Sequence, residues 1–322
     1  MSRLVLLYIC IFFMSCERNE IAIEPHVMGE VELQQINMQS NYSQQIFYNA
    51  SDNIVISSNT KSDWDLAFQS SDNGSQIIIN SSTFSQICEL EEHLFEDPIS
   101  ATDDLIWKWD SPKGIYDGTA FTNTESSTTY ILDRGYNIDG IQRGYRKIKI
   151  DSINSYSFFI TYSELDNTGM QSVEITKDSL LNFQYFSFNN NNIVNIEPEK
   201  DNWDLVFTQY THLYIDNLET PAYLVTGVLI NYLNNVMVAE DTVNSYENIN
   251  SGLISTYNFS QYQDQIGYNW KNFNFETQLY SMRSDIKYIL KDASNRYFKI
   301  QFLDFYNEMG EKGYPTFEIQ EL

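Results

Sequence analysis

The chain of 322 residues contains few histidines and cysteines, the side chains that most often ligate zinc. It has three histidines and three cysteines, scattered along the sequence, which argues against a structural zinc site. His-Glu-X-X-His, Gly-X-Ser-X-Gly, a phosphate-binding loop ending in Gly-Lys-Ser/Thr and Cys-X-X-Cys are all missing. A pair of glycosidase carboxylates among the 44 acidic residues is invisible without geometry. We therefore expect a protein that is not an enzyme.

His212 is the strongest single candidate for a binding residue. It ends the stretch "KDNWDLVFTQYTH", and in an extended strand its side chain shares a face with Tyr210 and Tyr214. Tyrosine rings around an imidazole could enclose a flat ligand. A hydrogen-bonded, inert histidine on a β face is the alternative interpretation. Of the other two histidines, His93 lies among carboxylates in "ELEEHLFED" and is expected to be solvated, and His26 lies in a polar N-terminal segment.

The elements that would position these residues are predicted to be β-strands. Apolar and polar residues alternate with a period of two in many short runs bounded by Asn, Asp, Ser and Gly, and β-branched and aromatic residues dominate them. Only "CELEEHLFED" and "EDTVNSYENIN" suggest short helices. The sequence predicts an all-β fold of antiparallel strands.

Three segments of the chain occur twice in the same order, which predicts an internal duplication. "KSDWDLAF" recurs as "KDNWDLVF", "YILD" followed by "GYRKIKI" recurs as "YILK" followed by "RYFKIQF", and "QQIFYNASDNIVIS" is similar to "FQYFSFNNNNIVNI". We expect one β unit over residues 41–182 and a second over 183–322.

The Trp-Asp-Leu signature is expected to be a core strand in each unit. Alternation would direct Trp203, Leu205 and Phe207 to one face. Asp204 would then accept backbone N–H groups of an adjacent turn or pair with the preceding lysine. The stretch from Thr208 to His212 has no counterpart in the first unit, so a function specific to the second unit is expected there.

The N-terminus "MSRLVLLYICIFFMSC" has the pattern of a secretory signal over residues 1–16, because its apolar run is too short to span a bilayer. Its end resembles a bacterial lipobox, in which Cys16 would be lipidated. Residues 17–40 would form a polar tether. Only Cys88 then remains as a thiol of the mature domain, so the core must hold without disulfides.

The formal net charge of −25 repels phosphate backbones and anionic lipid headgroups. We therefore expect no nucleic-acid partner, and contact with the membrane only through the lipid anchor.

The sequence resembles the HmuY family of bacterial haem-binding lipoproteins. The resemblance depends on the signal that ends in Cys16, on the "DWDLAF" and "NWDLVF" strands, and above all on "YILKDASNRYFKIQFLDFYNEMGEKGYPTFEI" near the C-terminus. It is best over residues 183–322. It implies an all-β lipoprotein attached to the outer membrane at the cell surface, which takes haem, free or from haem-carrying proteins, and passes it to an outer-membrane transporter.

The resemblance also implies two axial side chains on the haem iron, histidine or methionine. His212 is the first candidate, with Tyr210 and Tyr214 beside the porphyrin. Met237 in "NNVMVAED" is the nearest soft donor downstream, and Met282, Met309 or a tyrosine are alternatives. Two other functions remain open: a non-enzymatic surface module that binds a glycan or a protein, and a related fold that has lost haem ligation.

Overall fold

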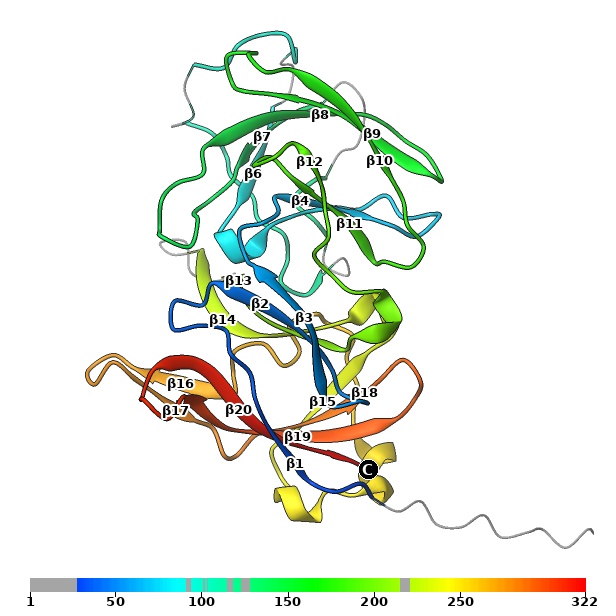
Figure 1. Ribbon diagram of the computed structural model, residues 1–322, viewed down its shortest axis with the longest axis vertical. Helices are drawn as coiled ribbons and strands as arrows, with labels where there is room; N and C mark the ends of the chain where they lie inside the picture. Colours follow the sequence, from blue (N-terminus) through cyan, green and yellow to red (C-terminus); the bar gives the residue numbers. More distant parts are fainter. Residues whose placement is uncertain are drawn as a thin grey trace, which may run out of the picture.

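The computed structural model describes residues 28–90, 94–100, 102, 104–114, 118–122, 128–214 and 221–322. Within these residues the chain forms antiparallel sheets, which confirms the all-β prediction. Figure 1 shows the sheets stacked as four layers, which pair into an upper and a lower sandwich.

The upper sandwich contains a five-stranded and a four-stranded sheet. In spatial order, the first sheet consists of β10 (Gln171–Thr176), β9 (Ser157–Ser163), β8 (Tyr145–Ile153), β7 (Thr129–Asp133) and β6 (Gln86–Leu90). The second consists of β12 (Asn192–Val194), β11 (Phe183–Ser187), β4 (Leu66–Gln69) and β5 (Ile77–Ile79).

The lower sandwich repeats this architecture. Its four-stranded sheet consists of β14 (Ala222–Ile230), β13 (Leu205–Leu213), β2 (Gln44–Asn49) and β3 (Ile54–Thr60). Its five-stranded sheet consists of β1 (Glu32–Gln35), β20 (Lys312–Glu321), β19 (Tyr297–Tyr306), β18 (Lys287–Lys291) and β15 (Met237–Asp241). A separate hairpin joins β16 (Lys271–Asn274) to β17 (Leu279–Met282).

Helical structure among the described residues is limited to short 3-10 turns. These are η1 (Ser81–Thr83), η3 (Lys200–Asn202), η4 (Tyr232–Asn234), η5 (Tyr246–Asn248) and η6 (Ser251–Thr256). The helix expected in "CELEEHLFED" is wrong for residues 88–90, which belong to β6, whereas "EDTVNSYENIN" contains only the turn η5. Cys88 of β6 lies opposite Ile131 of β7, and this strand pairing overrides the weak helical pattern of the sequence.

The two sandwiches exchange their hairpins. In the hairpin of β2 and β3, β2 pairs with β13 of the second sequence unit, where Leu205 lies opposite Tyr48. In the hairpin of β11 and β12, β11 pairs with β4 of the first unit, where Leu66 lies opposite Phe186. The boundary expected between residues 182 and 183 therefore does not separate the sandwiches. Repeated sequence identifies equivalent strands, but the equivalent hairpins could pair with either copy of the central strand.

The tether expected over residues 17–40 is wrong for its C-terminal part. Glu32–Gln35 form β1 on the edge of β20, and the next two apolar side chains, Ile36 and Met38, are each only 1% exposed. The alternation of apolar and polar residues in this segment is too short to predict a strand from the sequence alone. Residues 1–27, including Cys16 and His26, and residues 91–93, including His93, lie outside the described residues.

The side chains of the two Trp-Asp-Leu segments contribute to three hydrophobic cores. Leu205 and Phe207 lie in the lower core, and Leu66 lies in the upper core. Trp64 and Trp203 lie in a third core between the two sandwiches. The expectation that Trp203 shares the face of Leu205 is therefore wrong, because regular strand geometry begins only at Leu205.

The signature also ties the exchanged hairpins to their sheets. The carboxylate of Asp204 accepts the backbone N–H of Ala50 at 2.7 Å, and that of Asp65 accepts the backbone N–H of Phe188 at 2.7 Å. Asn231 donates to the carbonyls of Lys200 and Trp203, where the segment enters β13. Of the two roles expected for the aspartate, the acceptor of turn N–H groups is confirmed.

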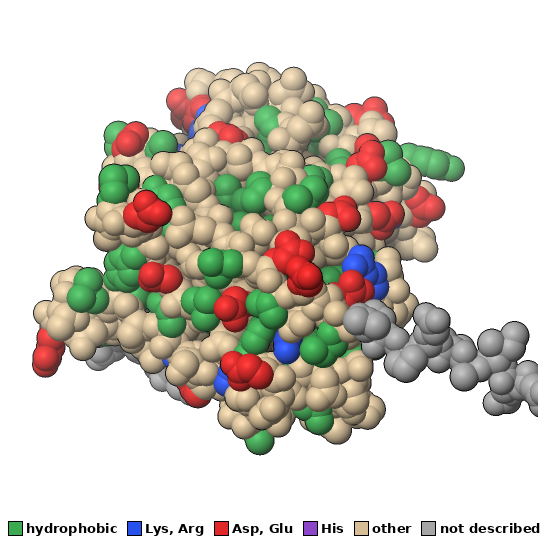
Figure 2. All heavy atoms as spheres, turned by 60° about the horizontal axis from the view of Figure 1, so that its bottom comes forward, with side chains coloured by type: hydrophobic (Ala, Val, Ile, Leu, Met, Phe, Trp, Pro, Cys, Tyr) green, Lys and Arg blue, Asp and Glu red, His purple; other side chains and the backbone are tan. Residues whose placement is uncertain are grey.

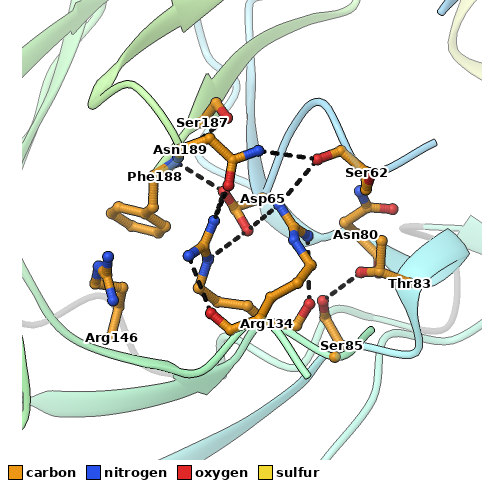
Figure 3. A network of polar contacts seen from close by, with 12 residues as sticks. Ser62, Asp65, Asn80, Thr83, Ser85, Arg134, Arg146, Ser187, Phe188 and Asn189 are labelled. Carbon is orange, nitrogen blue, oxygen red and sulfur yellow. Dashed lines mark hydrogen bonds and ion pairs between the residues drawn. The ribbon is translucent and has the colours of Figure 1, made fainter. Parts of the chain in front are cut away.

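Asp65 carries an additional ion-pair network (Figure 3). Arg134 Nε lies 2.9 Å from Asp65 Oδ1, and Arg143 Nη2 lies 2.9 Å from the same oxygen. Arg134 also donates to Asn189 of the exchanged hairpin at 2.6 Å. Among the ion pairs of the described residues none includes Asp204, so the two anchors differ in strength.

Candidate functional site

His212 lies near the end of β13, opposite Tyr223 of β14. Its side chain is half-buried. It shares the face of Val206 and Tyr210, whose side chains lie in the core between the sandwiches. The face of β13 toward the upper sandwich therefore carries the histidine.

Two tyrosines pack edge-on against the imidazole. The ring centroids of His212 and Tyr214 lie 4.9 Å apart at an interplanar angle of 79°, and those of His212 and Tyr268 lie 5.0 Å apart at 71°. Tyr214 is 37% exposed and Tyr223 is 55% exposed, whereas Tyr210 is 2% exposed. The structure brings His212 and Tyr214 together, but Tyr210 lies beneath the surface of this aromatic cluster.

The surroundings of the imidazole favour its neutral form. Burial lowers the pKa of His212, and the nearby Asp264 carboxylate opposes this shift only in part. His212 Nδ1 is buried and has no hydrogen-bond partner among the described residues. Burial and the neighbouring Tyr214 raise the pKa of Tyr268 to about 12, so its phenol stays protonated at neutral pH. The cluster presents an uncharged imidazole with an incompletely used nitrogen.

The segment Gln263–Tyr268 brings Tyr268 and Asp264 to this site. It runs along the edge of β14, where Val228 and Gly267 exchange two backbone hydrogen bonds of 2.9 Å. The approach is close: a Cβ on Gly227 would lie 2.4 Å from the carbonyl oxygen of Gly267. Sequence reasoning missed this segment, since it lies more than fifty positions from His212 and has no recognised motif.

Met237 lies on the far side of the lower sandwich from His212. In β15 the neighbouring Val238 points into the lower core. Ala239, which shares the phase of Met237, lies in a small cluster on the outer face of the sheet. The lower core therefore separates Met237 from His212, and the two side chains cannot ligate one iron in this arrangement.

The methionine alternatives are not better placed. Met282 packs against the lower core from β17, and Met309 is 79% exposed between β19 and β20. Among the described residues there is also no cluster of three or more His, Cys, Asp or Glu side chains that could hold a metal ion.

Fold and site define an all-β protein of two antiparallel sandwiches, with a neutral histidine held in a tyrosine cluster. Residues 179–319 match the family model described as HmuY protein, so this part of the chain is HmuY-like, as the resemblance indicated. The matched segment contains β13, His212 and Tyr268. No curated protein matches the chain.

Three solved structures resemble the chain at low identity. The apo HmuY analogue of Tannerella forsythia is 9% identical, covering 91% of this chain and 97% of its own, with a TM-score of 0.32. Apo PinO, attributed to Porphyromonas gingivitis, is 8% identical over 91% and 97%, with a TM-score of 0.31. A proposed HmuY-like haem-binding protein of Bacteroides vulgatus is 16% identical over 42% and 82%, with a TM-score of 0.19.

Proposed function

We propose that this protein binds haem through His212 and is a non-catalytic, lipid-anchored protein that captures haem at the cell surface for iron uptake. The observation that carries the proposal is the buried, unpartnered Nδ1 of a neutral histidine within the HmuY-like segment. Imidazole binds iron only in its neutral form. A buried nitrogen without a partner fits a ring whose bonding is completed by a bound group.

The residues around His212 fit one axial ligand. Bound haem would supply an iron that accepts the imidazole and a flat apolar ring that packs on aromatic side chains. Tyr214, Tyr223 and Tyr268 are the tyrosines placed to contact that ring, two of them partly open to solvent. Tyr210 would support the site from below.

The geometry does not support a second ligand from the same cluster. For Tyr214 or Tyr268 to hold the iron together with His212, haem would have to fit between that tyrosine and the imidazole. His212 packs directly on Tyr214 and Tyr268, at 4.9 and 5.0 Å between ring centroids, which leaves no gap for a ring system. With Met237 on the far side of the lower core, we propose a single protein ligand.

The surface charge supports a partner that is neither nucleic acid nor an anionic membrane. Acidic side chains are spread over the face shown in Figure 2, and few lysines and arginines accompany them. No helix among the described residues is long and apolar enough to cross a membrane. Attachment through lipidated Cys16 and transfer of haem from carrier proteins to an outer-membrane transporter remain parts of the proposal.

Haem titration of the chain lacking residues 1–16 tests the function. We expect a saturable Soret band in the wild type. In His212→Ala the affinity should fall by at least about tenfold, the loss typical of disturbing a metal site.

The two other histidines supply matched controls. His26→Ala and His93→Ala should bind haem as the wild type does. Loss of the Soret band in His93→Ala but not in His212→Ala would transfer the site elsewhere. A wild type without any Soret response would refute haem binding and would favour the surface module for glycans or proteins, for which the exposed Tyr214 and Tyr223 are the natural contacts.

A further inference from the structure

A cavity of about 90 Å³ lies between the upper and lower sandwiches; Tyr210 and Thr211 line it, but His212 does not. Its walls come from both four-stranded sheets and include Trp64, Trp203, Tyr185 and Glu197. Because one buried water needs only roughly 10–15 Å³ of cavity, the space holds a few waters or one small polar group.

The two tryptophans of this cavity are equivalent positions of the repeated signature. Trp64 packs edge-on against Tyr185 with ring centroids 4.9 Å apart, and Trp203 packs edge-on against Phe47 at 5.0 Å. The strand registers also make Tyr185 the counterpart of Phe47. The surroundings of both indole rings thus follow the same plan.

Their indole N–H groups are treated differently. Trp64 Nε1 donates to Gln45 Oε1 at 3.1 Å, and the Gln45 amide in turn donates to Ser82 and Thr208. In the same register, Phe183 occupies the position equivalent to Gln45. Phenylalanine offers no acceptor, and Trp203 Nε1 is buried without a partner although its side chain is only 6% exposed.

Glu197 places an incompletely used oxygen on the same cavity. Its Oε1 accepts the backbone N–H groups of Asn182 and Phe183, at 2.5 and 2.9 Å. Among the residues that the structure describes, its Oε2 accepts one hydrogen bond, from the Tyr185 hydroxyl at 3.3 Å. A carboxyl group has about four acceptor sites, so Oε2 has capacity for one more bond.

Burial favours the uncharged form of this acid. It raises the pKa of Glu197 to about 8, and the three donors around the carboxyl group oppose the shift only in part. At pH 7 the carboxyl group is therefore mostly protonated, and it would form only a weak ion pair with an ammonium ion. A neutral ligand matches this environment better than a cation.

We propose that the cavity is a binding site for a small neutral carboxamide or acetamido group, whose carbonyl accepts from Trp203 Nε1 and whose N–H or carbonyl bonds with Glu197 Oε2. Such a group has about four heavy atoms, which suits a space that holds a few waters. The bound group would supply to Trp203 the amide oxygen that Gln45 supplies to Trp64. The site does not depend on haem binding.

Indole NMR tests this site directly, because the chain has five tryptophans and each gives one indole N–H signal. Titration with acetamide should shift, saturably, the signal that is missing in Trp203→Phe. The mirror variant Trp64→Phe should keep that shift. Phe183→Gln builds the missing acceptor into the chain and should weaken acetamide binding by at least tenfold.

The same titrations separate the other outcomes. N-acetylglucosamine in place of acetamide shows whether the group is recognised as part of a sugar, and either probe alone supports the site. No saturable shift with either probe means that the cavity holds only water and overturns the proposal. An equal shift in Phe183→Gln, or a larger one with methylammonium, also overturns it. If Trp203→Phe does not fold, Phe183→Gln and Trp64→Phe decide the question by themselves.

Discussion

Replacing Asp65 by asparagine should destabilise the protein far more than the equivalent Asp204→Asn. The Asp65 side chain is fully buried, and Arg134 and Arg143, with side chains 6% and 5% exposed, both lie 2.9 Å from its carboxylate. Asparagine would leave both guanidinium groups buried without an anion. Removing one partner of a buried ion pair costs roughly 3–5 kcal/mol, so we expect a loss in this range from the free energy of unfolding.

Asp204→Asn is the matched control. Asp204 accepts the N–H of Ala50 just as Asp65 accepts that of Phe188, but no ion pair among the described residues includes it, and Arg296 acts on it only from a distance. The amide oxygen of asparagine can still accept this bond, so we expect a loss of about 1 kcal/mol.

Urea unfolding at pH 7, followed by tryptophan fluorescence, measures both variants against the wild type. Adding Arg143→Met to Asp65→Asn should recover part of the loss, since one unpaired charge disappears. A loss in Asp65→Asn within about 1 kcal/mol of that in Asp204→Asn would refute the reasoning, because it would mean that the arginines relax into solvent.

Three further predictions concern buried groups. The folded protein keeps a proton on Glu197 up to a pKa of about 8, whereas the unfolded chain releases it near 4.5, so this group's contribution to stability falls as pH rises between these values. Glu197→Gln should flatten that slope in urea unfolding from pH 5 to 8, and an unchanged slope would contradict the assignment. Burial lowers the pKa of Lys271 to about 7 from 10.5, so the unfolded chain binds more protons between these values and stability rises with pH there. Lys271→Met should remove this rise and raise the urea midpoint most below pH 7; no gain there would mean that the Thr226 carbonyl and the Trp270 ring offset the cost of burying the ammonium group. Gly227→Ala should lower stability by roughly 1–3 kcal/mol and weaken haem binding, because the added Cβ collides with the Gly267 carbonyl, and calorimetry with a Soret titration would detect either failure.

The strands were predictable because the alternation of apolar and polar residues within each strand shows which face is buried. In β19, Phe298, Ile300 and Phe302 turn into the lower core, and the period of two is visible without any neighbour. The roles of the signature were predictable to the same extent: Leu205 and Phe207 are core residues, and Asp204 accepts a turn N–H.

The pairing of these strands was not predictable. The hairpins that contain Tyr48 and Phe186 are similar, so either could complete either central strand. The candidate site shows the same division. His212 and Tyr214 lie two positions apart and share a face, whereas Tyr268 arrives from a segment that pairs with the edge of β14.

By itself, the sequence determined the all-β class, the repeated strands, the acidic surface and the position of the single candidate histidine in a tyrosine-rich strand. These properties depend on residue type and local periodicity. The tertiary structure alone decided that the hairpins are exchanged, that Met237 is separated from His212 by the lower core, and that Trp203 lacks the acceptor that Trp64 has. Such facts depend on contacts between residues far apart in the chain, and a linear pattern carries no record of which distant partner a buried group meets.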